Sequence, residues 1–379
     1  MTKDRSIVIK NIYYMLSYAF TILKQSPYET IEKEPFDNIN NLFAAILAKG
    51  IGLQLKQGLY RAYTHRVENR HVVRGKINLP GTMKNRLQHR LAVTCDYGEL
   101  SEDNLLNQIL KSTVILLLKQ KDLQNKYKAE LKKEMLFFSN VAEIDLKQVR
   151  FSDIRFQRNN RTYQMLLAIS QLLIESSLLT TEPGEYRLMG FLDGQRMCRL
   201  YEKFILEYYA QEFGRRIKGF SARASQIPWQ LDDGFGALLP IMQTDITLTY
   251  GGQTLIIDAK YYERIWQSRF DVETFHSGNL YQIFTYVKNK DAAVAGTGHQ
   301  VSGMLLYAKT DEDLVPDNVY HMSGNQISVK TLDLNQAFPK IAEQLDDIVK
   351  DHFDLATSSV ICLTLPFGKQ EKSLLCRNI

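Results

Sequence analysis

The stretch Gln243-Thr-Asp-Ile-Thr-Leu-Thr-Tyr-Gly-Gly-Gln-Thr-Leu-Ile-Ile-Asp-Ala-Lys-Tyr-Tyr262 decides the fold prediction. Polar and apolar residues alternate over residues 243–250, as in a strand with one buried face. Gly251-Gly252 suits a two-residue turn in which both central residues have positive φ. The stretch therefore predicts an antiparallel hairpin in which Tyr250 faces Gln253.

Two acids and a lysine lie on this hairpin. Counting outward from the turn places Asp245 opposite Asp258, with Cβ atoms roughly 4.5–5.5 Å apart. Like charges directly opposite each other destabilise a sheet, so a divalent cation between the carboxylates is a physical explanation for the pair. Lys260 lies two residues beyond Asp258 and therefore points to the same face of the strand. We predict a compact cluster of two aspartates and one lysine.

The whole chain has the composition of an ordinary globular protein of two domains. It has 379 residues, of which 45% are hydrophobic and 23% charged. The net charge of +5 is compatible with a polyanionic partner but does not identify one. The four cysteines show no CxxC spacing, so neither a zinc site nor a disulfide framework is indicated. Without a signal-peptide pattern or an apolar run of ~18–20 residues, we expect a cytoplasmic protein with no membrane contact.

The order of the predicted elements indicates an α/β protein. Extended segments are expected over residues 7–12, 60–77, 91–96, 303–308 and 326–330, and helices over residues 38–58, 101–120, 163–179, 197–216, 279–286 and 336–353. A Pro-Gly break within residues 180–185 marks the predicted domain boundary. We predict an α+β N-terminal domain over residues 1–180 and an α/β domain with a central mixed sheet flanked by helices over residues 186–353. A tail of uncertain structure follows over residues 354–379.

Further candidate residues lie on the segments before and after the hairpin. Glu202 shares one stripe of its predicted helix with apolar residues, where an acid needs a partner. An ordinary surface glutamate on a broad helix explains the spacing equally well. Gln282 and Tyr286 share one face of the following helix at i, i+4. His276, in the polar segment before that helix, is either a surface histidine or a DNA contact.

The spacing of the three hairpin residues fits the PD-(D/E)xK nuclease pattern, although Thr244 stands where that pattern often has proline. Phosphodiester hydrolysis needs an activated water and neutralisation of developing charge, which one or two Mg²⁺ ions held by carboxylates supply. We therefore predict that Asp245, Asp258 and the backbone carbonyl of Ala259 bind Mg²⁺. Lys260 would orient or help deprotonate the attacking water. A purely structural hairpin is the alternative.

The pair Gln282-xxx-Tyr286 resembles the QxxxY motif of RecB-like nucleases in this superfamily. That resemblance implies that Glu202 is an additional acid of the metal site. It also implies that Gln282 and Tyr286 contact DNA or position the catalytic groups.

A wider set of motifs resembles the McrC family over about residues 7–353. The motifs are Asn11-Ile-Tyr-Tyr-Met-Leu-Ser-Tyr-Ala19, Arg74-Gly-Lys-Ile77, Asn107-Gln-Ile-Leu-Lys-Ser-Thr113, Thr244-Asp-Ile-Thr247, Asp258-Ala-Lys-Tyr-Tyr262 and Phe275-His-Ser-Gly-Asn-Leu-Tyr-Gln282. The resemblance implies the nuclease subunit of a McrBC-type, GTP-dependent and modification-dependent restriction system. It implies an N-terminal half that docks on a hexameric AAA+ GTPase called McrB, enters its pore and stimulates GTP hydrolysis. It also implies a C-terminal half that cuts double-stranded DNA, with GTP bound only by the partner.

Two other functions remain open at the level of sequence. One is a stand-alone RecB-like repair nuclease, which the QxxxY pattern favours. The other is a GTPase-activating interaction protein with a vestigial nuclease site, against which the intact Asp245, Asp258 and Lys260 argue. Since the sequence has no P-loop motif, any NTPase motor must be a separate chain.

Overall fold

The computed structural model of the protein describes residues 3–4, 7–156, 160–177, 194–234, 236–261, 266–269, 272–309 and 316–355. The chain forms two compact units. One, here called the sheet unit, comprises Met1–Asn38 and Gly190–Ile379, and the other, the helical unit, comprises Ile39–Met189. The predicted boundary at residues 180–185 and the predicted tail from residue 356 onward lie outside the described residues.

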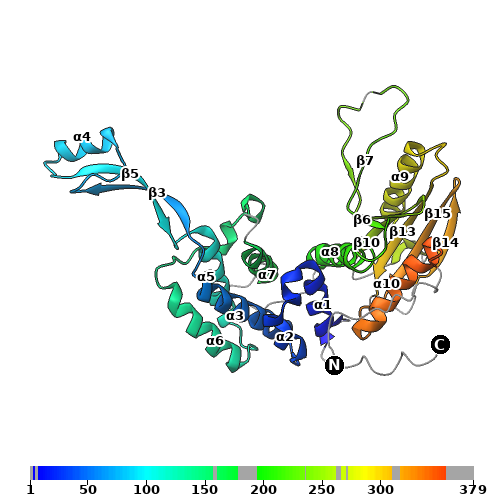
Figure 1. Cartoon of the computed structure of the whole chain (residues 1–379), viewed down its shortest axis with the longest axis horizontal. Coiled ribbons are helices and arrows are strands. Elements are labelled where there is room, and N and C mark those ends of the chain that lie inside the picture. The colour runs from blue at the N-terminus through cyan, green and yellow to red at the C-terminus, as the bar shows by residue number, and fades with distance from the viewer. Residues whose placement is uncertain are drawn as a thin grey trace. The chain divides into compact units, whose positions relative to one another are not determined.

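A six-stranded mixed sheet is the centre of the sheet unit (Figure 1). Its strands, in spatial order, are β14 (Asn318–Met322), β15 (Asn325–Leu332), β13 (Gln300–Ala308), β10 (Gln253–Lys260), β9 (Ile246–Tyr250) and β6 (Ser221–Arg223). Strands β10, β13 and β15 run parallel, and the outer pairs are antiparallel. Because β10 is central and flanked on both sides, its residues 254–259 are all buried.

Helix α9 (Ser277–Ala293) covers one face of this sheet. Its Ile283 and Val287 pack in one cluster with Ile256 of β10 and Leu305 of β13. Helices α8 (Gly194–Glu212) and α10 (Phe338–Phe353) lie together on the opposite face, where the Tyr208 hydroxyl donates to the Asp346 carboxylate at 2.7 Å. The predicted mixed sheet flanked by helices is therefore confirmed.

Helix α1 (Ile9–Ala19) belongs to the sheet unit, although it lies near the start of the chain. The Asn11 amide donates to the carbonyls of Leu334 and Gln336, at 2.8 and 2.7 Å, and the Tyr18 hydroxyl donates to Glu212 of α8 at 2.9 Å. The predicted strand over residues 7–12 is wrong, because only Ile7–Val8 is extended (β2) and the helix begins at Ile9. The division of the chain also differs from the predicted domain 1–180, because residues 1–38 pack with the later unit.

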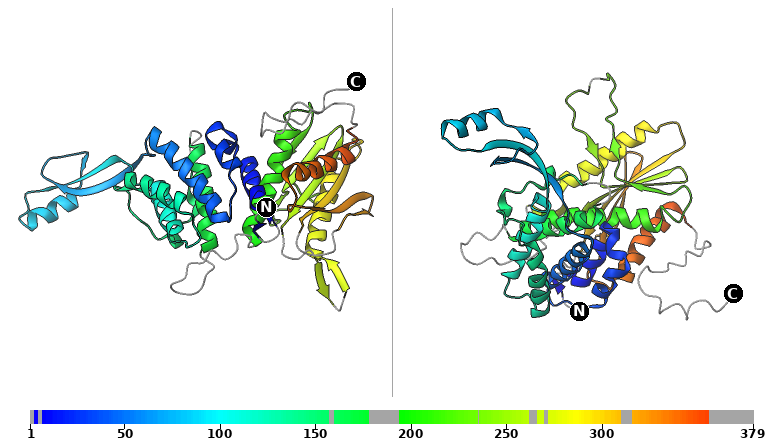
Figure 2. Two further views of the ribbon diagram at one scale, coloured as in Figure 1. Left: turned by 90° about the horizontal axis from the view of Figure 1, so that it is seen from below. Right: turned by 60° about the vertical axis from the view of Figure 1, so that its left-hand side comes forward.

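The remaining described elements of the sheet unit are short or peripheral. They are β1 (Lys3–Asp4), the 3₁₀ helices Thr21–Lys24 and Ser26–Tyr28, α2 (Glu29–Lys33), the antiparallel pair β7 (Gln226–Ile227) and β8 (Met242–Gln243), and the hairpin β11 (Trp266–Arg269) and β12 (Val272–Phe275). Figure 2 gives two further views of these elements.

The helical unit consists of a helix bundle and a projecting arm (Figure 1). The bundle contains α3 (Ile39–Gln57), α5 (Leu105–Leu118), α6 (Asn125–Met135) and α7 (Arg161–Ser177), with 3₁₀ turns at Leu136–Phe138, Leu146–Gln148 and Phe151–Asp153. The arm is made of β3 (Ala62–Arg70), β4 (Lys76–Ile77), α4 (Leu79–Leu87) and β5 (Val93–Ser101), with β5 in the middle of the three strands.

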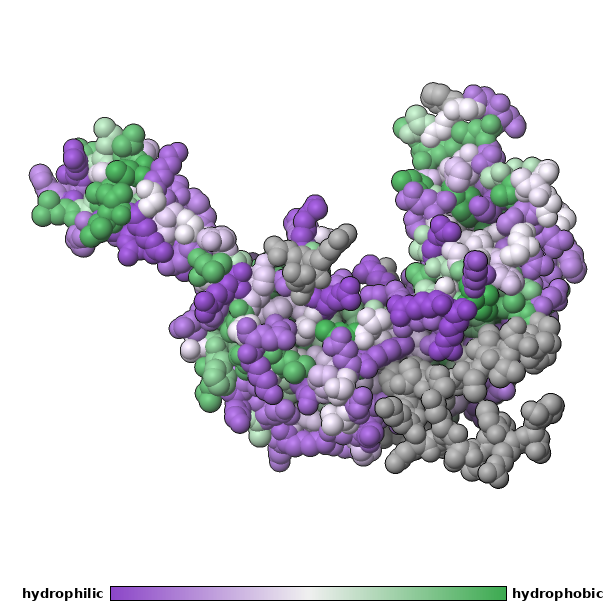
Figure 3. Space-filling view, in the orientation of Figure 1, coloured by the Kyte–Doolittle hydropathy of each residue, from purple (hydrophilic) through white to green (hydrophobic). Residues whose placement is uncertain are grey.

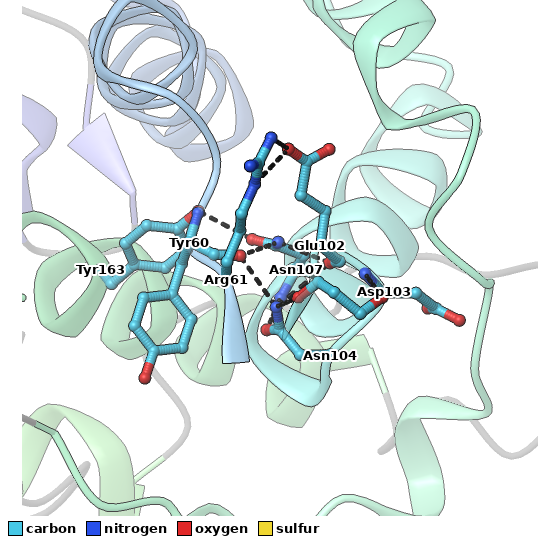
Figure 4. Close-up of polar contacts among 8 residues, drawn as sticks. Tyr60, Arg61, Glu102, Asp103, Asn104, Asn107 and Tyr163 are labelled. Atoms are coloured by element: carbon cyan, nitrogen blue, oxygen red, sulfur yellow. Dashed lines mark hydrogen bonds and ion pairs between the residues drawn. The ribbon is translucent and has the colours of Figure 1, made fainter. Parts of the chain in front are cut away.

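The base of the arm is held to the bundle by a buried polar network (Figure 4). The Asn107 amide donates to the carbonyls of Tyr60 and Glu102, at 2.9 and 2.7 Å. Tyr60 lies just before β3 and Glu102 directly follows β5. The Asn107 oxygen accepts from the Tyr163 hydroxyl of α7 at 2.7 Å, and that hydroxyl accepts from the Tyr60 N–H at 2.8 Å. Asn104 also donates to the Tyr60 carbonyl and caps α5, which begins at Leu105, whereas the sequence predicts a helix over residues 101–120.

The arm exposes many large apolar side chains, and hydrophobic surface gathers toward its end (Figure 3). They are Tyr63, Val67, Val72, Val73, Ile77, Leu79, Met83, Leu87 and Leu91. Soluble monomers rarely expose a continuous apolar surface of this kind, and such patches mark interaction sites. Among the helices of the described ranges, none is long and apolar enough to cross a membrane.

Candidate active site

The Gly-Gly hairpin forms with the predicted register. Gly251 and Gly252 both have positive φ, at 57° and 83°, as a primed two-residue turn requires. The ladder runs from Tyr250 opposite Gln253 to Ile246 opposite Ile257. It ends one pair before the position of the two acids, so both carboxylates lie at the end of the hairpin farthest from the turn.

Asp245 and Asp258 meet at this end of the ladder. The Asp245 carboxylate reaches across to β10, where its Oδ2 accepts from the Ala259 N–H at 2.9 Å. Burial raises the pKa of the neighbouring Asp258 carboxyl group, which is only 1% exposed, and the charge of Asp245 raises it further. The structure thus brings together the two acids that the register predicted to be neighbours.

Lys260 lies on the same face as Asp258 and contacts it directly. Its Nζ donates to Oδ1 at 3.0 Å and lies 2.8 Å from Oδ2, so the ammonium pairs with both oxygens of the carboxylate. The Lys260 side chain is 14% exposed, so this ion pair is shielded from bulk water. The predicted cluster of two aspartates and one lysine is present.

Helix α9 adds two residues to the cluster. The Gln282 Oε1 atom accepts from Lys260 at 3.2 Å, and the Gln282 amide donates to the Tyr286 hydroxyl at 2.9 Å. That hydroxyl donates to the Gln243 carbonyl at 3.1 Å, which lies two residues before Asp245. A chain of hydrogen bonds therefore links the two ends of the site through α9 and fixes the position of the lysine.

Glu202 of α8 lies near the cluster, where burial and the surrounding charges change its pKa. Burial, and next the charge of Asp245, raise its pKa to about 7. Within the described residues, however, no three His, Cys, Asp or Glu side chains converge at metal-binding distance. The role of Glu202 as a further metal ligand stays a prediction. His276 is the residue before α9 and is half-buried, and its predicted DNA contact is equally untested.

Burial disfavours the charged forms of both acids, and Lys260 offsets part of this cost. Burial raises the pKa of Asp245. Burial also raises the pKa of Asp258, where Lys260 opposes the shift and the charge of Asp245 adds to it. The Asp258 carboxylate is buried, and the Lys260 ammonium lies 2.8 Å from its Oδ2 atom. Two adjacent carboxylates beside a single ammonium of the described residues fit a hard divalent cation, because Mg²⁺ takes oxygen ligands.

Sequence reasoning missed the main-chain part of the site. The carbonyl of Gln243 and the side chain of Thr244 fix the segment that carries Asp245, and neither belongs to the acid–lysine pattern. The only signal in the sequence is the threonine that stands in place of the usual proline.

Comparison with known proteins adds independent information. A family model described as "McrBC 5-methylcytosine restriction system component" matches residues 2–308. The type IV methyl-directed restriction enzyme EcoKMcrBC of Escherichia coli K12 is 29% identical over 351 residues, which is 91% of this chain and 98% of the relative.

Two solved structures from Thermococcus gammatolerans are also similar. One is a half-complex of a tetradecameric assembly of McrB AAA+ hexamers with bound McrC, at 17% identity and a TM-score of 0.48, covering 90% of this chain and 75% of that chain. The other is a McrBC complex, at 19% identity and a TM-score of 0.40, covering 54% and 58%. Both TM-scores lie below 0.5, so family membership rests on the sequence match. Because that match extends over well more than half of the chain, the protein belongs to the family of McrBC 5-methylcytosine restriction-system components.

Proposed function

We propose that this chain is the nuclease subunit of a GTP-dependent McrBC-type restriction system and hydrolyses DNA phosphodiester bonds with Mg²⁺. The observation that carries the proposal is the convergence of Asp245, Asp258 and Lys260 at one end of the central hairpin. Membership of the restriction-system family agrees with a nuclease site of this kind.

The residues present fit a divalent cation. Asp245 and Asp258, with the carbonyl of Ala259, are the groups that would hold Mg²⁺, because in the described part of the chain the two buried carboxylates share only one neighbouring ammonium, that of Lys260. When bound, Mg²⁺ supplies charge stabilisation to the phosphoryl group and lowers the pKa of a bound water.

The protein's own side chains divide the remaining work. Lys260 is held between Asp258 and Gln282, so its ammonium has a fixed position beside the carboxylates. From there it can orient a water and offset negative charge on a phosphate. Gln282 of α9 gives the Lys260 ammonium a second acceptor besides Asp258, and Tyr286 holds Gln282 in place.

We further propose that the partner is a hexameric AAA+ GTPase and that GTP is bound only there. In the Thermococcus gammatolerans assembly McrC is bound to McrB AAA+ hexamers. The exposed apolar arm of the helical unit supplies a surface suited to a protein partner. The absence of a P-loop motif from this sequence agrees with a separate motor subunit.

The test is DNA cleavage by the full chain with its partner GTPase, GTP and Mg²⁺. Asp258→Ala and Lys260→Ala should each lower the cleavage rate by on the order of 100-fold or more. GTP turnover should stay at the wild-type level. Asp347→Ala and Lys350→Ala, which remove an exposed ion pair on α10, are the matched controls. Undiminished cleavage by both site variants would refute the assignment, and equal cleavage without partner or GTP would refute the motor-dependent mechanism.

A further inference from the structure

Thr244 lies in a short break in the strand that leads to Asp245. Strand β8 ends at Gln243 and β9 begins at Ile246, while on the neighbouring segment β6 ends at Arg223 and β7 begins at Gln226. Regular pairing therefore stops on both sides of residues 244–245. At such a break the main-chain polar groups need other partners.

The Thr244 hydroxyl takes the place of a main-chain carbonyl in this break. The Thr244 N–H donates to the Ser225 carbonyl at 2.9 Å, as in an ordinary ladder. The return bond is different, because the Ser225 N–H donates to the Thr244 Oγ1 atom at 3.0 Å. The hydroxyl also donates to the Ser225 carbonyl at 3.1 Å and lies 2.9 Å from the Thr247 hydroxyl.

This arrangement uses the full capacity of the hydroxyl group. A threonine hydroxyl has one donor and two acceptor positions, and here it donates to Ser225 O and can accept from both Ser225 N and Thr247. The side chain of Thr244 is buried, with the residue 1% exposed. A buried hydroxyl with every position filled fixes the main chain around it in one geometry.

The residue that follows directly is Asp245. Because the hydroxyl satisfies Ser225, the main chain leaves the regular ladder at Thr244 and the Asp245 side chain turns toward β10. There its carboxylate accepts from the Ala259 N–H at 2.9 Å. Proline, the residue of the wider nuclease pattern, has neither an N–H nor a hydroxyl and cannot make any of the bonds to Ser225.

We propose that Thr244 is a positioning residue, which sets the orientation of the Asp245 carboxylate for metal binding through its hydroxyl group. The proposal rests on the function proposed above, because it takes Asp245 as a metal ligand. Removal of groups that orient metal ligands commonly lowers metal affinity by about 10- to 100-fold.

The test is isothermal titration calorimetry of the full chain with Mg²⁺ alone and, separately, with Mn²⁺ alone, without DNA or partner. Thr244→Val keeps the shape of the side chain and removes the hydroxyl, and we expect a Kd raised by about 10-fold or more. Thr244→Ser keeps the hydroxyl and should restore the affinity. Thr249→Val on β9, half-buried and opposite Thr254, is the matched control.

A double substitution separates positioning from general structural support. In an Asp245→Asn background, Thr244→Val should have no further effect on the Kd, because the carboxylate that it orients is gone. An equal loss of affinity with and without Asp245, or wild-type affinity in Thr244→Val, would overturn the proposal. If Asp245→Ala and Asp258→Ala both bind Mg²⁺ like the wild type, the metal site itself is wrong. If they lose binding while Thr244→Val retains it, only the positioning role fails.

Discussion

Asn107→Asp is the substitution whose effect on stability follows most directly from the structure. The Asn107 amide donates two hydrogen bonds, to the carbonyls of Tyr60 and Glu102 at the base of the arm, and Asn107 is fully buried. Asn107→Asp keeps the size of the side chain but turns the donating nitrogen into an oxygen. Two carbonyls then face a carboxylate, and the Tyr163 hydroxyl bond is the only side-chain contact of the original three that survives.

The magnitude follows from the two lost hydrogen bonds and from the newly buried carboxylate. Two neutral hydrogen bonds contribute roughly 1–3 kcal/mol in total, and a buried carboxylate that faces two carbonyls adds a cost of similar size. The Tyr60 and Glu102 carbonyls each keep a hydrogen bond from the Asn104 amide. We therefore expect the helical unit to lose about 3 kcal/mol or more of its unfolding free energy. Tyr163→Phe, which removes two bonds without adding charge, should cost about 1–3 kcal/mol. Tyr63→Phe on the exposed surface of the arm is the control and should be neutral.

The assay combines urea unfolding with hydrogen exchange of the full chain. Two compact units predict more than one unfolding transition, and Asn107→Asp should shift only the transition of the helical unit. Amides at the base of the arm, over residues 60–64 and 99–107, should exchange faster than in the wild type. A shift below ~0.5 kcal/mol together with unchanged exchange would show that the network does not hold the arm to the bundle.

Two further predictions concern the packing of each unit. A Cβ atom at Gly303 would lie 2.7 Å from Val287 and 2.8 Å from Ile283, both on α9. Gly303→Ala should therefore lower the free energy of unfolding by about 1–3 kcal/mol. It should also reduce DNA cleavage, because α9 carries Gln282, which binds Lys260. Thermal unfolding and DNA cleavage assays measure these two effects. Gly278→Ala is the control, because a Cβ atom there would meet open space. Normal cleavage by a destabilised Gly303→Ala protein would contradict the link between this packing and the site. Burial raises the pKa of Glu134 to about 8. The folded protein therefore keeps a proton that the unfolded chain loses above about pH 4.5. The free energy of unfolding should fall as pH rises from about 4.5 to 8. Glu134→Gln should remove on the order of 2 kcal/mol of this pH dependence in unfolding measured from pH 5 to 9, and an unchanged slope would mean that Glu134 is not its source.

The hairpin was predictable from sequence because its information is local. The Gly251-Gly252 pair specifies the turn, and strand alternation then determines which residues face each other. The same local reasoning brought Asp258 and Lys260 to one face. The i, i+4 spacing of Gln282 and Tyr286 also predicted their mutual contact.

The contacts between distant segments were not predictable in the same way. Apolar periodicity shows that a helix has a buried face, but not which element covers that face. The direction of Gln282 toward Lys260 depends on how α9 packs across β13, and the bond from Tyr286 to the Gln243 carbonyl depends on a break in the strand. The same limit applies to Thr244, because a threonine in a strand is ordinary by composition alone.

The largest difference from the sequence prediction concerns the first 38 residues, and it changes where a partner-docking function should be sought. The sequence predicts that Asn11 lies in a short strand, residues 7–12, of the N-terminal domain 1–180, whereas it lies on helix α1. In the structure its amide donates to two carbonyls more than 300 positions away, and the helix packs on α8, which carries Glu202. The helical unit is therefore an insertion within the sheet unit, bounded by residues 39 and 189. A fragment that ends at residue 180 would expose the apolar face of α1 and leave the Asn11 amide without its two acceptors, the carbonyls of Leu334 and Gln336. Any docking surface for a GTPase is thus better sought within residues 39–189, while residues 1–38 serve the unit that holds Asp245 and Asp258.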